Sequence, residues 1–137
     1  MATYDELRIG DTASFSKTIS ETDVYLFAGI SGDFNPAHVN EVEASKGMFG
    51  KRVVHGMLTA SFISTVLAMK LPGPGTIYVG QELQFRAPVF IGDTITATVE
   101  CIEKLEERKW AKFRTTVTNQ EGKVVVTGTA TVIPPAG

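Results

Sequence analysis

The chain has 137 residues, of which 43% are hydrophobic and 20% charged, a composition typical of one globular domain with a buried core. Its net charge of −2 at pH 7 predicts no nucleic-acid partner, and its single cysteine excludes an internal disulfide bond. Residues 1–7 lack the basic and apolar regions of a secretory signal, and no transmembrane segment is predicted. We therefore expect a single domain over residues 1–137, located in the cytoplasm and without a membrane partner.

The first predicted elements are a strand and a short helix. Residues 12–20 alternate partly between apolar and polar side chains, which predicts a strand. Ser20 and Asp23 have the spacing of a capping box at a helix amino terminus, so a helix is predicted over residues 21–28. The helix is expected to end near Gly29, because glycine commonly terminates helices.

Residues 31–38 follow this helix and carry a carboxylate and an imidazole on either side of a proline. Asp33 and His38 are five positions apart, a spacing that would separate them on the surface of a regular helix. Pro36 restricts the backbone around it, so a stiff irregular loop is predicted. Such a loop can hold an acid and a base within reach of one small molecule, as acid–base catalysis requires. On the pattern alone, the simpler interpretation is structural: a helix cap followed by an Asx turn at Asp33 and Asn35.

Residues 56–71 are predicted to form a long helix that is buried on nearly all sides, because its side chains are apolar or small. The proline- and glycine-rich residues 72–75 end it. Before it, residues 40–45 are expected to form one or two helical turns.

The rest of the chain is predicted to form strands with alternating apolar and polar residues. Their ranges are 77–86, 94–101, 111–118 and 124–132. The short links between them favour an antiparallel meander with one buried face, on which Cys101 is expected to be a small core residue. A buried helix beside an antiparallel sheet predicts an α+β fold in which the sheet curls around the helix.

Three blocks of the sequence occur in the order of a known family signature. They are the Gly-Asp-Phe-Asn-Pro-Ala-His run at residues 32–38, the Val-Val-His-Gly-Met-Leu run beginning at Val53, and residues 80–89. Together they resemble the MaoC-like, hydratase 2 type, (R)-specific enoyl-CoA hydratases, and the resemblance covers nearly the whole chain. It implies the hot-dog fold, in which an antiparallel sheet wraps around a long central helix. It also implies an overhang, roughly residues 30–55, that carries the site, and a homodimer of two subunits paired edge to edge.

The same resemblance implies reversible hydration of trans-2-enoyl-CoA to (3R)-hydroxyacyl-CoA, without a metal or another cofactor. Asp33 and His38 match the catalytic acid–base pair, and the backbone N–H of Gly56 matches the oxyanion-hole donor. A helix amino terminus suits that role, since its N–H groups are unpaired and its dipole end is positive. Asn35 and Ser64 match supporting or substrate-binding positions. No cluster of cysteine, histidine and acidic residues has metal-ligand spacing, which agrees with the absence of a metal.

Other activities of related folds stay open at this point. They are a (3R)-hydroxyacyl-acyl-carrier-protein dehydratase, an acyl-CoA thioesterase, and a non-catalytic module that binds acyl thioesters. The central helix lacks the aspartate or glutamate that the first two commonly carry, which favours the hydratase. Lys46, Lys51 and Arg52 are candidates to meet coenzyme A phosphates, although a solvated loop is the simpler interpretation. His55 is expected to be a structural hydrogen-bonding residue.

Overall fold

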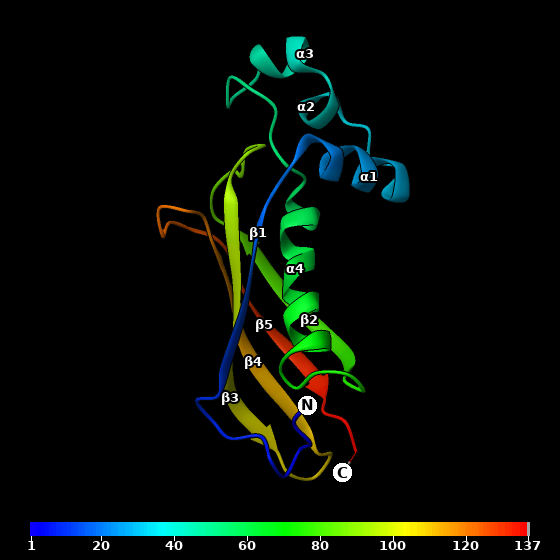
Figure 1. Cartoon of the computed structure of the whole chain (residues 1–137), viewed down its shortest axis with the longest axis vertical. Coiled ribbons are helices and arrows are strands. Elements are labelled where there is room, and N and C mark those ends of the chain that lie inside the picture. The colour runs from blue at the N-terminus through cyan, green and yellow to red at the C-terminus, as the bar shows by residue number, and fades with distance from the viewer. Residues whose placement is uncertain (137) are drawn as a thin grey trace.

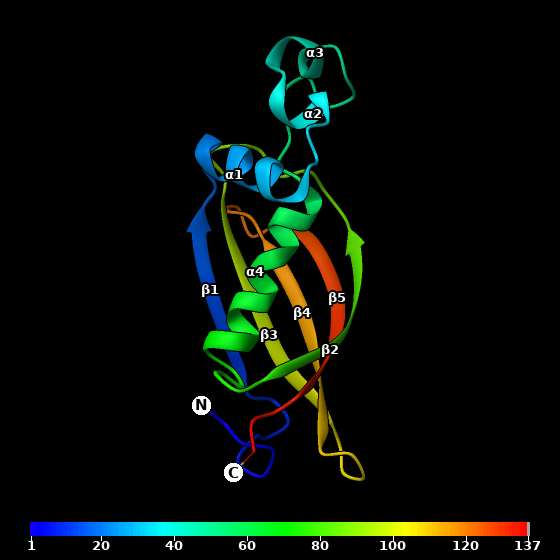
Figure 2. The same cartoon turned by 90° about the vertical axis from the view of Figure 1, so that its right-hand side faces the viewer.

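The computed structural model describes residues 1–136 and contains a five-stranded antiparallel sheet with one long helix against one face (Figures 1 and 2). Three short helices lie at one end of the molecule, beyond the amino terminus of the long helix, and the first and last described residues lie at the other end. The elements are β1 (Thr12–Thr18), α1 (Glu21–Ser31), α2 (Pro36–Val39), α3 (Glu41–Ser45), α4 (Gly56–Met69), β2 (Ile77–Phe85), β3 (Thr94–Leu105), β4 (Trp110–Thr118) and β5 (Val124–Ile133). Within residues 1–136, no helix combines the length and apolar character needed to cross a membrane.

The strand order is β1-β3-β4-β5-β2, which corrects part of the predicted meander. Strands β3, β4 and β5 pair in sequence order, but β2 pairs with β5 instead of β3. The link between β2 and β3, residues 86–93, is longer than a hairpin turn, so it carries the chain across to β3, which lies next to the opposite edge strand β1. On the way its Val89 carbonyl accepts a 2.7 Å hydrogen bond from the Val54 amide.

The capping box predicted at Ser20 is confirmed. The Ser20 hydroxyl accepts from the Asp23 amide at 3.1 Å, and the Asp23 carboxylate accepts from the Ser20 amide at 2.9 Å. The predicted end near Gly29 is wrong, because α1 continues to Ser31. Gly32 ends it instead, with φ of 81°, a left-handed conformation that glycine adopts without steric cost.

Two other predicted boundaries also differ from the structure. Helix α4 ends at Met69 instead of residue 71. Strand β3 continues past Cys101 to Leu105, because a register shift between Cys101 and Glu103 interrupts the alternation without ending the pairing.

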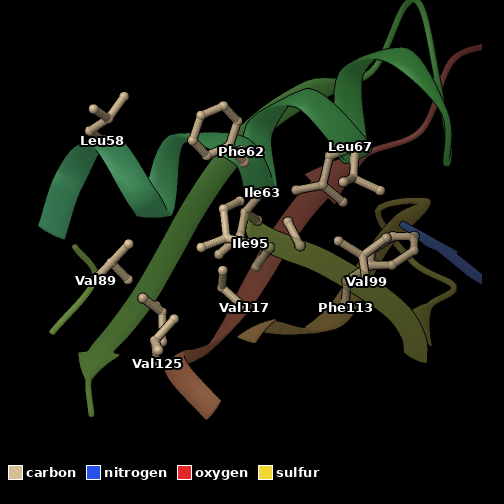
Figure 3. Packing of buried hydrophobic residues seen from close by; sticks show 14 of the residues in the cluster. Leu58, Phe62, Ile63, Leu67, Val89, Ile95, Val99, Phe113, Val117 and Val125 are labelled. Atoms are coloured by element: carbon tan, nitrogen blue, oxygen red, sulfur yellow. The ribbon is translucent and has the colours of Figure 1, made fainter. Parts of the chain in front are cut away.

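The core lies between α4 and the sheet (Figure 3). The alternating residues predicted for the inner face of β3 and β4 are fully buried, and Cys101 is among them. They are Ile95, Ala97, Val99, Cys101, Ala111, Phe113, Thr115 and Val117. Ile63 and Leu67 of α4 pack onto this face.

One side of α4 is open, which corrects the prediction of a helix buried on nearly all sides. Met57, Ser61 and Ala68 are exposed and Ser64 is half-buried, at spacings that form one stripe along the helix. Met57 retains 58% of its accessible surface. The sheet covers only the opposite side of the helix. The apolar character of all its sides therefore did not mean that all its sides are buried.

Candidate active site

The loop that carries Asp33 is ordered by its own side chains. The Asp33 carboxylate accepts from the Asn35 amide at 3.1 Å, and the Asn35 side chain accepts from the Ala37 amide at 2.9 Å. Asn35 thereby caps α2, with Pro36 at the first helical position, where a missing N–H costs nothing. Residues 36–39 are therefore helical, which corrects the prediction of an irregular segment. Asp33 remains exposed just before α2.

His38 lies in α2 with a defined tautomer. Its Nδ1 is 2.7 Å from the Val53 carbonyl oxygen. A carbonyl oxygen only accepts, so Nδ1 carries the proton and donates it to this bond. In the neutral ring the lone pair is then on Nε2, the nitrogen available to take a proton from another group.

His55 joins these residues from the amino terminus of α4. Its Nε2–H donates to the backbone carbonyl of Asp33 at 3.0 Å, and its ring stacks on His38 with 3.9 Å between the ring centroids. The Phe27 ring of α1 lies against the His55 ring, with 4.9 Å between the two ring centroids. As a result, one nitrogen or oxygen atom from each of Asp33, His38 and His55 lies within 4.8 Å of the other two.

The addition of His55 to the Asp33 and His38 pair was not indicated by spacing along the chain, and the group of three contains residue types that bind metals. The two rings are stacked with only 27° between their planes. Nitrogen lone pairs lie in the ring planes, so those of His38 and His55 do not converge on one point as tetrahedral metal ligands do. The separation within the group instead suits one water molecule that hydrogen-bonds to Asp33 and His38.

Gly56 directly follows His55 and is the first residue of α4. Its N–H has no hydrogen-bond partner within residues 1–136, as expected for the first turn of a helix. A Cβ atom at this position would lie 2.8 Å from a ring carbon of Phe85, so any other residue would have to displace this exposed ring. The free donor is one peptide bond away from the residue that contacts both Asp33 and His38.

Two hollows flank α4. The first, of about 410 Å³, is lined by Val53, Gly56 and Phe85 among others. The second, of about 550 Å³, lies between α4 and β2, and Ser64 lines it beside Ser61. The structure therefore places Gly56 and Ser64, predicted to serve one site, on different hollows.

The overhang is held by Arg52, which is only 15% exposed. Its guanidinium donates to the carboxylates of Glu21 in α1 and Glu41 in α3, and to the Tyr25 hydroxyl at 3.0 Å. The hydrogen bond with Arg52 holds the pKa of Glu21 below its usual value. Because two carboxylates already occupy this guanidinium, its role here is internal, in contrast to the phosphate contact considered from the sequence. The Nζ atom of Lys51 lies 4.2 Å from the centroid of the Phe90 ring, over the face of that ring.

The structure combines a five-stranded sheet, one long helix and an overhang that carries an acid and an imidazole. Proteins of a known family are similar to this chain. The family model of the MaoC like domain matches residues 6–123. This chain belongs to the MaoC-like family. Its match spans the loop of Asp33, helix α4 and most of the sheet.

Individual MaoC-like relatives are similar over most of their length. An (R)-specific enoyl-CoA hydratase of Rhodospirillum rubrum is 56% identical, over 97% of this chain and 92% of its own. A 3-hydroxybutyryl-CoA dehydratase of Methylorubrum extorquens is 44% identical, over 96% and 83%. The unliganded R-hydratase PhaJ1 of Pseudomonas aeruginosa superposes with a TM-score of 0.93 at 43% identity, over 98% of this chain and 86% of its own. The fold predicted from the sequence, a hot-dog fold with a central helix, is confirmed.

Proposed function

We propose that this protein is an (R)-specific enoyl-CoA hydratase, a hydro-lyase that reversibly converts trans-2-enoyl-CoA to (3R)-hydroxyacyl-CoA. The relatives of high identity carry the names of this reaction or of its reverse. The observation that carries the proposal is the grouping of the Asp33 carboxylate and the His38 imidazole within 4.8 Å, beside the free amino terminus of α4.

In the proposed reaction, Asp33 and His38 bind the attacking water between them. The oxygen of water bonds to the β-carbon as the carbon–carbon double bond opens, and its electrons move toward the thioester oxygen. One proton of the water passes to the pair, and a proton returns to the α-carbon. The neutral Nε2 of His38 suits the first transfer, because its lone pair is free while Nδ1 donates to Val53.

The charge that develops on the thioester oxygen needs a donor. We assign this role to the N–H of Gly56, which has no partner within the described chain and sits at the positive end of the α4 dipole. Loss of one such donor typically lowers a rate by about 10²–10³-fold. Asn35 is assigned to ordering the loop, since it accepts from the Ala37 amide, and Ser64 to the wall of the second hollow.

The competing activities that place a catalytic acid on the central helix, a thioesterase or a carrier-protein dehydratase of that type, lack support from α4. Its residues Gly56–Met69 contain no aspartate or glutamate. A non-catalytic module would not need both Asp33 and His38 in one group. Coenzyme A as the carrier follows the printed names of the relatives at 56% and 44% identity. Relatives at 37% and 34% identity are named 3-hydroxyacyl-[acyl-carrier-protein] dehydratases, so a carrier-protein dehydratase that acts through Asp33 and His38 is the alternative.

The proposal is tested with crotonyl-CoA in two parallel tubes. We expect the absorbance of the conjugated enoyl thioester to fall without release of free thiol, and an (R)-specific dehydrogenase to oxidise the product. Thiol release would indicate a thioesterase and remove the proposed roles of Asp33 and His38. An unchanged absorbance would contradict hydration of this short-chain substrate.

We also propose a homodimer. Strand β2 is an edge of the sheet, and its Ile77 and Val79 retain 58% and 44% of their accessible surface. Val79 lines the second hollow together with exposed Met57. A second copy that pairs along this edge would cover both the unpaired backbone groups and the apolar side chains. Sedimentation equilibrium should give twice the 14.8 kDa of one chain, whereas the mass of a single chain would contradict the dimer. The cytoplasmic location stays a prediction.

A further inference from the structure

We infer that His55 is a positioning residue, which sets the distance between the acid–base pair and the oxyanion donor at the amino terminus of α4. This inference rests on the proposed hydratase function. From the sequence, His55 is expected only to make a structural hydrogen bond. A positioning role predicts in addition that substitution of His55 lowers turnover by more than the loss of folding stability explains.

His55 occupies the cap position of α4 without serving the helix. Cap residues usually accept a hydrogen bond from a backbone amide of the first turn. The His55 side chain makes no such bond within the described chain and turns away toward the overhang. It does so although it retains only 2% of its accessible surface and leaves Nδ1 without a partner in residues 1–136. A buried polar atom without a partner costs stability, so this arrangement does not serve the stability of the helix.

The His55 side chain instead connects the two halves of the proposed site. Its Nε2–H donates to the Asp33 carbonyl at 3.0 Å, and this fixes the loop from which the Asp33 carboxylate projects. Its ring stacks on the His38 ring at 3.9 Å between centroids, which limits the positions that His38 can adopt. The next peptide unit presents the N–H of Gly56.

This connection matters for the chemistry because three groups must reach one substrate together. Asp33 and His38 act at the double bond, and the Gly56 N–H acts at the thioester oxygen. The first two belong to the overhang and the third to α4, so an error in their separation affects the reaction even when each group is intact. A misplacement of about 1 Å is enough to lower a rate by about 10²-fold.

Three substitutions separate this role from simple burial. In His55→Gln the side-chain amide nitrogen takes the place of Nε2 and can still donate to the Asp33 carbonyl. In His55→Asn the amide nitrogen takes the place of Nδ1 and cannot reach that carbonyl. His55→Phe keeps a ring to stack on His38 but has no donor.

Turnover of crotonyl-CoA is the first measurement. We expect kcat of His55→Asn and His55→Phe to fall about 10²-fold with little change in KM, and kcat of His55→Gln to stay within about tenfold of the wild type. Phe113→Leu is the matched control for lost core packing, since Phe113 is fully buried and lies beside Leu67, at the other end of α4 (Figure 3). It should lower the thermal midpoint and leave kcat unchanged. Equal kcat values for the Gln and Asn variants would overturn the inference.

Hydrogen exchange gives a second measurement that does not depend on activity. The amides of Asn35, Ala37 and His38 are hydrogen-bonded in the wild type, so they report whether the loop holds its geometry. We expect faster exchange in His55→Asn and His55→Phe than in His55→Gln. Unchanged exchange of these amides in all three variants would overturn the inference, whether or not crotonyl-CoA is a substrate. If the wild type lacks hydratase activity but the variants show the expected differences in exchange, the result counts against the proposed function alone.

Discussion

Asp33→Asn is expected to lower kcat for hydration of crotonyl-CoA by about 10²–10⁴-fold, with KM and the thermal midpoint nearly unchanged. The asparagine oxygen can still accept the bond that the Asn35 amide makes to the Asp33 carboxylate at 3.1 Å, so the loop keeps its shape. A carboxamide does not act as a general acid or base at neutral pH, so the acid–base pair is lost. Steady-state kinetics and circular dichroism on the same preparation measure both effects.

Asp11→Asn is the matched control for this change. The Asp11 carboxylate also accepts from a backbone amide, that of Arg8 at 2.9 Å. Asp11 directly precedes β1, which begins at the end of the molecule opposite the overhang (Figure 1). This variant should retain the kcat of the wild type. Near-normal turnover of Asp33→Asn would remove Asp33 from the mechanism, and loss of secondary structure would show that its role is in folding.

Gly128→Ala is expected to reduce the free energy of unfolding by about 3 kcal/mol, the upper range for inserting a methyl group into a packed core. Gly128 of β5 pairs with Leu83 of β2, and a Cβ atom there would overlap the backbone carbonyl oxygen of Glu82. That oxygen belongs to the main chain, so relief requires β2 to move away from β5. The Gln81 amide crosses the same gap and donates to both the Glu82 carbonyl and the buried Thr115 hydroxyl, bonds that this movement would break. Urea unfolding measures the loss.

Gly80→Ala provides the comparison for this prediction. Gly80 lies in β2 of the same sheet, but nothing lies within 4 Å of the position of an added Cβ. Removing a glycine from an unstrained position reduces the entropy of the unfolded chain, so this variant should match or slightly exceed the stability of the wild type. If Gly128→Ala unfolds within about 0.5 kcal/mol of Gly80→Ala, β2 adapts without cost, and the strand contact is looser than the structure indicates.

Features that depend on neighbouring residues were predictable from the sequence. The capping box at Ser20 and Asp23 and the alternation of β3 and β4 rest on hydrogen bonds or faces set within a few residues. The Asn35 cap of α2 was not predicted as such, although Asn followed by Pro at a helix start is its ordinary signal. The failure came from treating Pro36 as an interruption, although proline is well suited to the first turn of a helix.

The sequence by itself determined a domain built from one apolar helix and alternating strands, and the family signature directed attention to Asp33, His38 and Gly56. The tertiary structure decided the rest: β2 pairs with β5, one stripe of α4 is open, Arg52 holds the overhang, and His55 stacks on His38. These outcomes depend on segments brought together from distant parts of the chain. The local preferences of residues do not describe such contacts, because strand order and ring stacking depend on packing over the whole core.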